Sequence, residues 1–216
     1  MHMRSLIKNK WKEIRERHML DLIIGGSASG KSAYGEKLAY TYYQNVNHNI
    51  QNTVVEFPMY YVATLMAYDE ESRKRIKKHQ NQRKEKPFKT IECFYDIRRI
   101  KNEISKKGVF YIECMSNLLA NEIYAKEGSL KAVTFEEQKV KAWDSIITPI
   151  LELSEGENKV VLITNEIFSD GGAYDRETKD YIALLGYINE CLSKEAEHVV
   201  EVVCSIPVSV KGTLPC

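Results

Sequence analysis

Short apolar runs recur along the chain, and they constrain its fold more than any other feature. They are rich in Val, Ile and Tyr, and they are continuous rather than alternating with polar residues. Strands that are buried on both faces of a parallel sheet have this pattern. Helical patterns separate the runs, so strand–helix–strand repetition predicts an α/β fold. The predicted strands are Leu20–Ile24, Tyr60–Thr64, Val109–Glu113, Val160–Thr164 and Val199–Cys204.

Charge and composition exclude several classes of protein. The chain has 216 residues, and its 31 Lys and Arg against 30 Asp and Glu give a formal charge of +1. A dedicated nucleic-acid binder would carry a basic excess over the whole molecule. With 44% hydrophobic residues the chain is also unlike a disordered protein. Any binding of a polyanion must therefore be local.

Cysteine usage and hydropathy bear on the compartment. The five cysteines are far apart and include no C-x-x-C pair, which disfavours a disulfide framework or a zinc site. No apolar run reaches the roughly 18 residues that span a bilayer, and no signal-peptide core is present at the N-terminus. We therefore expect reduced thiols, no membrane span and a cytoplasmic protein.

The predicted domain organisation is simple. Residues 1–19 carry six basic and two acidic side chains, and Ile7, Trp11 and Ile14 have helical spacing. This pattern predicts a basic N-terminal extension, most simply an amphipathic helix packed on the domain rather than a membrane or partner anchor. Residues 20–216 form one predicted catalytic domain. Within it we expect a loop over Tyr40–Phe57, which is rich in Asn, and a second loop over residues 171–175 before a long helix that ends near Leu192.

The segment after the first predicted strand matches the P-loop pattern G-x-x-x-x-G-K-[ST]. It consists of Gly25, Gly26, Ser27, Ala28, Ser29, Gly30, Lys31 and Ser32, and a helical pattern follows through Tyr40. Glycines let the backbone fold tightly, so that N–H groups and the positive end of the helix converge on phosphates. Lys31 is expected to contact the β- and γ-phosphates, and the Ser32 hydroxyl to ligate Mg²⁺. A nucleoside triphosphate such as ATP or GTP is the implied ligand.

A second metal ligand is expected at the end of a neighbouring strand. Glu113 follows four apolar residues, and ligands bind beyond the carboxyl ends of strands in open parallel sheets. The alternative is a solvated strand-end carboxylate. A small GTPase is disfavoured, because the chain has no D-x-x-G motif and Asn158-Lys159-Val160-Val161 lacks the acid of N-K-x-D.

A basic segment with one histidine follows the second predicted strand. Residues 73–86 hold eight Lys and Arg, one acidic residue and His79, and acidic residues open the predicted helix at Asp69. Taken alone, such a segment is most simply a solvated helix face with an exposed imidazole. Asp69 and Glu71 would then cap the helix or complement its dipole, the alternative being a role near the metal.

At this point the motifs together resemble the adenosylcobinamide kinase / adenosylcobinamide-phosphate guanylyltransferase family. The resemblance spans roughly residues 20–212 in order, and the ordered set is more specific than the P-loop alone. Its motifs are Gly25–Ser32, Tyr61–Thr64 with Asp69, Glu71, Arg75, Ile76, His79 and Arg83, then Thr90–Cys93, Ile112–Cys114 with Asn121, Thr164–Ile167, Gly186 with Asn189, and Ser205–Pro207 ahead of Lys211.

The resemblance implies a RecA-like P-loop fold and a two-step transferase of cobalamin biosynthesis. A nucleoside triphosphate would phosphorylate the aminopropanol hydroxyl of adenosylcobinamide, and GTP would then donate GMP through a covalent guanylyl-histidine. His79 aligns with that nucleophile, and neutral imidazole is a competent nucleophile near pH 7. Nearby cations would neutralise charge on the α-phosphate and on the departing pyrophosphate. The resemblance also implies a homotrimer, and it places Thr64, Leu65, Met66, Gln80, Asn81, Gln82, Arg83, Glu92 and Glu113 at the guanine nucleotide.

Several positions depart from the family pattern. Ala28 stands where the family commonly has Arg, and Phe168 and Ser205 stand where it has Gly. The loop Ser169–Arg176 also replaces a shorter connection. These changes bear on the corrinoid-facing surface more than on the phosphates. Two alternatives therefore stay open: a P-loop kinase of another small hydroxylated substrate without guanylyl transfer, and a nucleotide-binding regulatory or nucleic-acid module that uses the basic segment.

Overall fold

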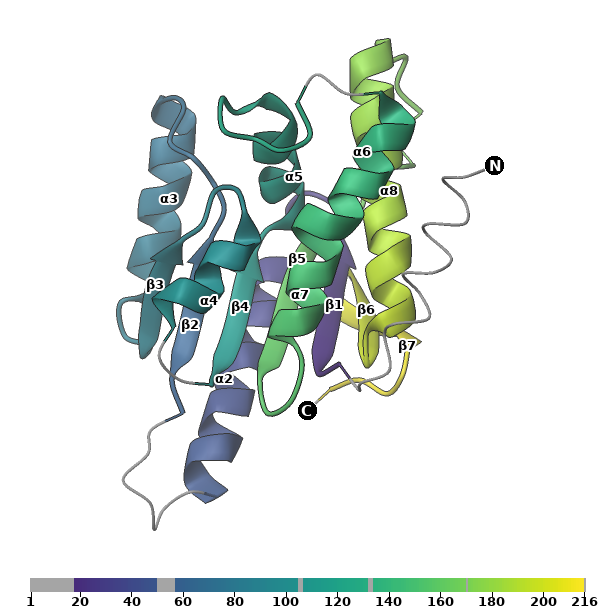
Figure 1. The fold of residues 1–216 in the computed structure, drawn as a ribbon. Coiled ribbons are helices and arrows are strands. Elements are labelled where there is room, and N and C mark those ends of the chain that lie inside the picture. The colour runs from purple at the N-terminus through teal and green to yellow at the C-terminus, as the bar shows by residue number, and fades with distance from the viewer. Residues whose placement is uncertain (1–17, 50–56, 105–106, 132–133, 170, 216) are drawn as a thin grey trace.

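A mixed sheet organises the structure, which is a computed structural model that describes residues 18–49, 57–104, 107–131, 134–169 and 171–215 (Figure 1). Seven strands within these residues form one sheet in the order β3-β2-β4-β5-β1-β6-β7. All neighbouring strands run parallel except β6 and β7. The strands are β1 (Leu20–Gly25), β2 (Met59–Ala63), β3 (Phe88–Glu92), β4 (Val109–Glu113), β5 (Lys159–Asn165), β6 (His198–Val203) and β7 (Ile206–Lys211). The predicted mostly parallel α/β fold is therefore confirmed.

Helices cover both faces of the sheet, as Figure 1 shows. Behind it lies α2 (Lys31–Asn49), whose Leu38 and Ala39 pack with the side chains of one sheet face. The other face packs against the helices drawn in front of it. Those helices are α4 (Ile100–Glu103) with the short turn η1 (Ile97–Arg99), α5 (Met115–Tyr124), α6 (Phe135–Ala142), the π-helical turn η2 (Trp143–Ile147), α7 (Thr148–Leu153) and α8 (Arg176–Glu195). The remaining described helix, α3 (Glu70–Arg83), lies beside β2 and β3.

Burial on both faces explains why the central strands are continuous apolar runs. Every residue of β4 is buried, and the interior residues of β1 and β5 are buried or nearly so. The register brings the carboxyl ends of these strands to one edge of the sheet, because Gly25 pairs with Asn165, and Ala63 with Glu113. The loops that carry the sequence motifs therefore meet at this edge.

The helix α2 was expected to stop near Tyr40, and that prediction was wrong. The helix continues to Asn49, so only residues 50–56 of the predicted loop lie outside the described residues. Tyr43 and Val46 pack against the core at helical spacing. Asn47 exchanges two hydrogen bonds of 3.0 Å with the backbone of Phe57, which ties the helix end to the chain that enters β2.

Two strands were missed in the sequence analysis. In β3 only Ile91 is buried. β7 has Pro207 as its second residue, and its other residues are exposed. Both are edge strands, so neither produces the continuous apolar pattern of a strand covered on both faces.

The ends of the described chain bear on two further expectations. Residues 1–17 of the predicted N-terminal extension lie outside the described residues, whereas His18 and Met19 have no regular secondary structure and lie against the domain. The His18 Nδ1 is 3.0 Å from the Leu151 carbonyl oxygen, and the Met19 N–H donates to the Ser154 carbonyl oxygen. Among the helices that the structure describes, none has the length and apolarity needed to cross a membrane.

Candidate functional site

The P-loop, defined as Gly25–Ser32, connects β1 to the start of α2. Its Gly30 adopts a φ of 93°, a conformation that favours glycine. The ammonium of Lys31 donates to the Gly26 carbonyl oxygen at 3.0 Å, which folds the side chain back over the loop. The P-loop runs directly into the N-terminus of the 19-residue helix α2, where the first backbone N–H groups have no acceptor within the helix, as an anion site requires.

The turn between β6 and β7 supports the P-loop from outside. The Ser205 N–H donates to the Ser29 carbonyl oxygen at 2.8 Å. A Cβ on Gly30 would come within 2.6 Å of the Ser205 Oγ, so the two loops are in close contact. Cys204 and Ser205 both have positive φ values, of 51° and 65°, as a tight two-residue hairpin requires. Ser205 thus keeps the turn geometry at the position where the sequence departs from the expected Gly.

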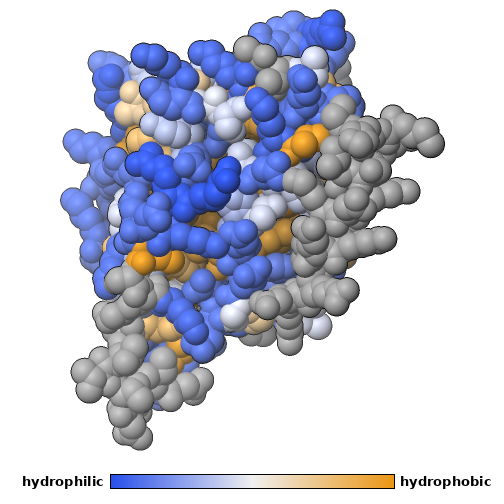
Figure 2. Space-filling view, in the orientation of Figure 1, coloured by the Kyte–Doolittle hydropathy of each residue, from blue (hydrophilic) through white to orange (hydrophobic). Residues whose placement is uncertain are grey.

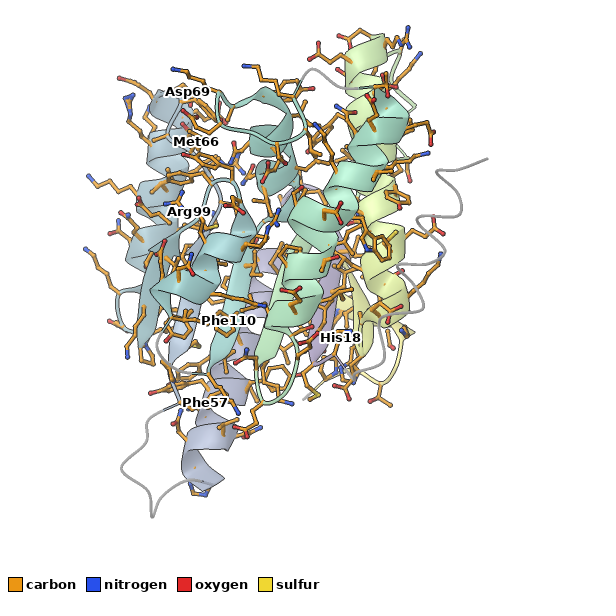
Figure 3. The ribbon with its side chains drawn as sticks, viewed as in Figure 1. His18, Phe57, Met66, Asp69, Arg99 and Phe110 are labelled. Atoms are coloured by element: carbon orange, nitrogen blue, oxygen red, sulfur yellow. The ribbon has the colours of Figure 1, made fainter. Side chains whose placement is uncertain are left out.

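The helix α3 brings His79 to the carboxyl edge of the sheet. Its N-cap is Asp69, whose carboxylate accepts from the Ser72 N–H at 2.7 Å, while the Ser72 hydroxyl accepts from the Asp69 N–H. Hydrogen bonding of the carboxylate to Ser72, chiefly to its backbone N–H, lowers the pKa of Asp69. Capping, one of the two roles left open for Asp69, is therefore the one that the structure shows. Figure 3 places Asp69 and Met66 at the same end of the molecule, far from His18 and Phe57.

Glu113, at the end of β4, is the centre of a compact polar cluster. Its Oε2 lies 3.6 Å from the His79 Nδ1 and 3.8 Å from the Arg83 Nη1. The Tyr61 hydroxyl donates to the same oxygen at 3.3 Å. Glu113 is only 9% exposed, so it is not the solvated strand-end carboxylate that was the alternative interpretation.

Arg83 has an unusual environment for a cation. Its guanidinium lies over the Tyr61 ring at 3.4 Å from the centroid, and the residue is 7% exposed. The buried Nη1 makes no hydrogen bond with any described residue. A buried charged donor without a hydrogen-bond acceptor is costly, unless a ligand supplies one. The Glu113 carboxylate, 3.8 Å from Nη1, pairs with the charge of Arg83, and the Nη1 N–H groups remain available to hydrogen-bond an anionic ligand.

The P-loop and the His79 cluster line one cavity of about 840 Å³. That volume lies within the usual range for a small-molecule site. Figure 2 shows that hydrophilic residues cover most of the visible face of the described part of the chain. Residues that the sequence analysis assigned to the site and that line this cavity are Ser27, Ala28, Lys31, Ser32, Leu65, Met66, His79, Gln80, Arg83, Glu92 and Glu113.

Other predicted site residues have different positions. Thr64 is fully buried, and its hydroxyl accepts from the Cys114 N–H at 2.6 Å and donates to the Cys114 carbonyl oxygen. Asn81 is exposed and lies outside the cavity lining, and the side chain of Gln82 is outside the described residues. The P-loop residues Gly25, Gly26, Ser29 and Gly30 are also absent from the lining.

The cavity also includes side chains that the sequence analysis did not assign to the site. Tyr61 comes from the middle of β2, Asn165 from the end of β5, Asn117 from α5 and Tyr181 from α8. The position of Thr164–Glu166 at the end of a predicted strand already places Asn165 at the ligand-binding edge of the sheet, although no role was assigned to its side chain. Nothing in the local sequence distinguishes Tyr181, because its role depends on the packing of α8 against α5.

Burial controls the electrostatics of the cavity. It lowers the pKa of Lys31, because removal from water disfavours the ammonium, while Cys114 and Glu113 oppose this effect. Burial likewise raises the pKa of Tyr61, with Glu113 adding to the shift. Tyr61 therefore stays a neutral hydrogen-bond donor. The cavity combines a backbone anion site, cationic side chains, a carboxylate and an imidazole, which suits phosphoryl or nucleotidyl transfer.

Comparison with known proteins identifies the family. The family model described as cobinamide kinase / cobinamide phosphate guanyltransferase matches residues 21–210. The chain belongs to this family. It is therefore a transferase of cobalamin biosynthesis, and the resemblance predicted from the motifs is confirmed.

Two curated relatives illustrate the distance within the family. The bifunctional adenosylcobalamin biosynthesis protein CobU of Escherichia coli is 27% identical over 198 residues, which cover 89% of this chain and all of that protein. The protein of the same name from Salmonella typhimurium is 26% identical over 197 residues, with the same coverage. Among solved structures, a protein of Pyrococcus horikoshii aligns with a TM-score of 0.47 and 11% identity, over 94% of this chain and 91% of that one.

Proposed function

We propose that this chain performs both family reactions in the one cavity described above. In the first, a nucleoside triphosphate phosphorylates the aminopropanol hydroxyl of adenosylcobinamide. In the second, GTP transfers GMP to the resulting phosphate through a guanylyl group on His79. The observation that carries the proposal is that His79 and Lys31 line the same cavity, so one bound nucleotide can lie beside both.

The P-loop supplies the kinase part of the proposal. Backbone N–H groups and Lys31 would hold the β- and γ-phosphates, and the acceptor oxygen would attack the γ-phosphorus while the bond to the β-phosphate oxygen breaks. Mg²⁺ fits the donor set, because the Ser32 hydroxyl and the Glu113 carboxylate both line the cavity and Mg²⁺ commonly takes one or two protein oxygens beside phosphates. Bound there, the ion would supply charge neutralisation at the phosphates.

The His79 cluster supplies the guanylyl transfer. The Glu113 carboxylate, 3.6 Å from the His79 Nδ1, would favour the tautomer that carries its proton on Nδ1 and its lone pair on Nε2. Nε2 would attack the α-phosphorus of GTP, forming a P–N bond as the bond to the β-phosphate oxygen breaks and pyrophosphate leaves. An oxygen of cobinamide phosphate would then attack the same phosphorus, breaking the P–N bond and restoring the imidazole. The free donor of Arg83 is suited to the charge that develops on the phosphate oxygens.

Covalent labelling tests this proposal directly. Incubation with Mg²⁺ and GTP labelled at the α-phosphate should give a protein adduct that is acid-labile and base-stable, as a phosphoramidate is. His79→Ala should abolish the label, and His48→Ala, a change at an exposed histidine near the far end of α2, should leave it unchanged. An unlabelled wild type that still phosphorylates cobinamide would support the alternative, a P-loop kinase without the guanylyl step.

Three further expectations form part of the proposal. ATP and GTP are both proposed phosphate donors, since the P-loop contacts phosphates rather than bases. A homotrimer is proposed from the family resemblance, and sedimentation analysis would test it. A cytoplasmic location is proposed because the described cysteines are free and the substrates are nucleoside triphosphates; fractionation of cells that express the chain would test it.

A further inference from the structure

A second cavity adjoins the nucleotide cavity. Its volume is about 550 Å³, and it lies where α5, α6 and the start of α8 meet. Figure 1 shows these three helices rising together beyond the carboxyl edge of the sheet. Ile123, Tyr124 and Phe135 form its apolar part. Tyr124 is 49% exposed, so an aromatic face is available to a ligand.

One residue is shared by the linings of the two cavities. Tyr181 lines both of them, and its hydroxyl donates to the Ser116 carbonyl oxygen at 3.0 Å. The Ser116 hydroxyl in turn accepts from the Asn165 amide at 2.6 Å, and Asn165 lines the nucleotide cavity. These hydrogen bonds fix the position of the Tyr181 ring. A ligand in the second cavity would therefore lie one side chain away from the nucleotide.

The charges of the second cavity disfavour another nucleotide. Its cations Lys131 and Arg176 are balanced by Glu177 and Asp180. Arg176 also faces Asp180, with 3.9 Å between the Nε and a carboxylate oxygen. A phosphate site needs a positive surplus, whereas paired charges and an amide such as Gln138 suit neutral groups that both donate and accept hydrogen bonds.

We propose that this second cavity binds the corrin ring of the cobinamide acceptor; the inference rests on the function proposed above. The ring is a broad apolar macrocycle edged with carboxamides, which matches an aromatic wall bordered by neutral polar and paired charged groups. Seven bonds join the ring to the reactive hydroxyl of the aminopropanol arm, a reach of about 8 Å from ordinary bond lengths. An arm of this length would span the width of the one residue that lines both cavities, and would bring the hydroxyl to the nucleotide cavity while the ring stays between α5, α6 and α8.

The test uses Tyr124, because a side chain with this exposure can be shortened without opening a cavity in the core. With the full-length enzyme, Tyr124→Ala should raise the KM for cobinamide about tenfold, the loss expected for one aromatic contact. Tyr124→Phe should restore the wild-type value, since the ring face makes the contact. Val210→Ala, at a 63% exposed residue of β7 outside both cavities, serves as the matched control.

Labelling by GTP alone separates the different failures. If wild type and Tyr124→Ala are labelled equally and their KM values for cobinamide are also equal, the second cavity is not the corrinoid site. If the wild type is neither labelled nor able to phosphorylate cobinamide, the proposed function itself fails. A raised KM for cobinamide with an unchanged KM for GTP supports the assignment.

Discussion

Asn121 is expected to hold the two loops on the α3 side of the nucleotide cavity. It is 3% exposed, and its amide donates to the carbonyl oxygens of Thr64 and Phe94, each at 2.8 Å. Its own oxygen accepts from the Tyr68 hydroxyl at 2.9 Å. Phe94 and Leu65, the residue after Thr64, line the cavity. The Asn121 side chain of α5 therefore connects the loop after β2 and the loop after β3 to the core.

Asn121→Leu keeps the size of the side chain and removes these hydrogen bonds. A buried carbonyl group and a partly buried one lose their donor, so we expect the free energy of unfolding to fall by about 2–3 kcal/mol. For a chain of this size, that loss lowers Tm by about 5–10 °C. Urea and thermal unfolding measure both quantities, and the KM for GTP should rise because Leu65 and Phe94 lose their fixed positions.

Tyr68→Phe is the matched control, because it leaves both amide hydrogen bonds of Asn121 in place and removes only the contacts of the Tyr68 hydroxyl with the Asn121 oxygen and the Met66 sulfur. Tyr68 is 61% exposed and water replaces the lost partner, so its stability should change by less than about 0.5 kcal/mol. If Asn121→Leu is as stable as the wild type, or is destabilised without any change in the KM for GTP, the positioning role is refuted.

Three further predictions concern the P-loop and α3. Lys31→Ala should abolish phosphate transfer to cobinamide. In the wild type, burial lowers the pKa of the Lys31 ammonium, so the affinity for nucleotide should start to fall at a pH below the ordinary lysine pKa of about 10.4. A pH titration of nucleotide binding in which affinity falls only above that pH would refute this reasoning. Asp69→Ala should lower Tm at neutral pH but not at acid pH. The Asp69 carboxylate has a lowered pKa in the folded state, so it stabilises the fold above its unfolded pKa and loses this effect as pH falls through the folded pKa. Equal differences in Tm between variant and wild type at both pH values would contradict the capping role. Gly30→Ala should lower Tm, since its Cβ would collide with Ser205 at a positive φ, whereas Gly26→Ala meets nothing within 4 Å; comparable thermal scans for the two variants would argue against the contact.

The elements predicted correctly from sequence are those whose environment is uniform. β1, β4 and β5 are covered on both faces, so their apolar runs follow directly from burial. β3 was missed because one face is open, and the length of α2 was underestimated because its last turns are polar in composition. In that stretch Asn47 stabilises the helix end through its hydrogen bonds with Phe57, a contact that no local pattern reveals.

In the candidate site, too, some residues could be predicted from sequence and others could not. The P-loop is contiguous, so its spacing identifies it from sequence alone. The cluster around Glu113 joins Tyr61 from β2 with His79 and Arg83 from α3, and the resemblance to a family placed His79 and Arg83 without indicating the stacking of Arg83 on Tyr61. Tyr181 comes from α8, about a hundred residues after His79, and only the packing of helices brings it to the same cavity.

The position of β1 inside the sheet has a consequence for synthesis of the protein. Its two neighbours, β5 and β6, lie in the second half of the chain, and the turn that supports Ser29 comes from Ser205. The phosphate-binding loop emerges from the ribosome early, but its supporting contacts exist only after nearly the whole chain has been made. Such non-local pairing is slow to form. A nascent or truncated chain that ends before β6 would carry the complete P-loop motif and still lack the support that gives this loop its shape.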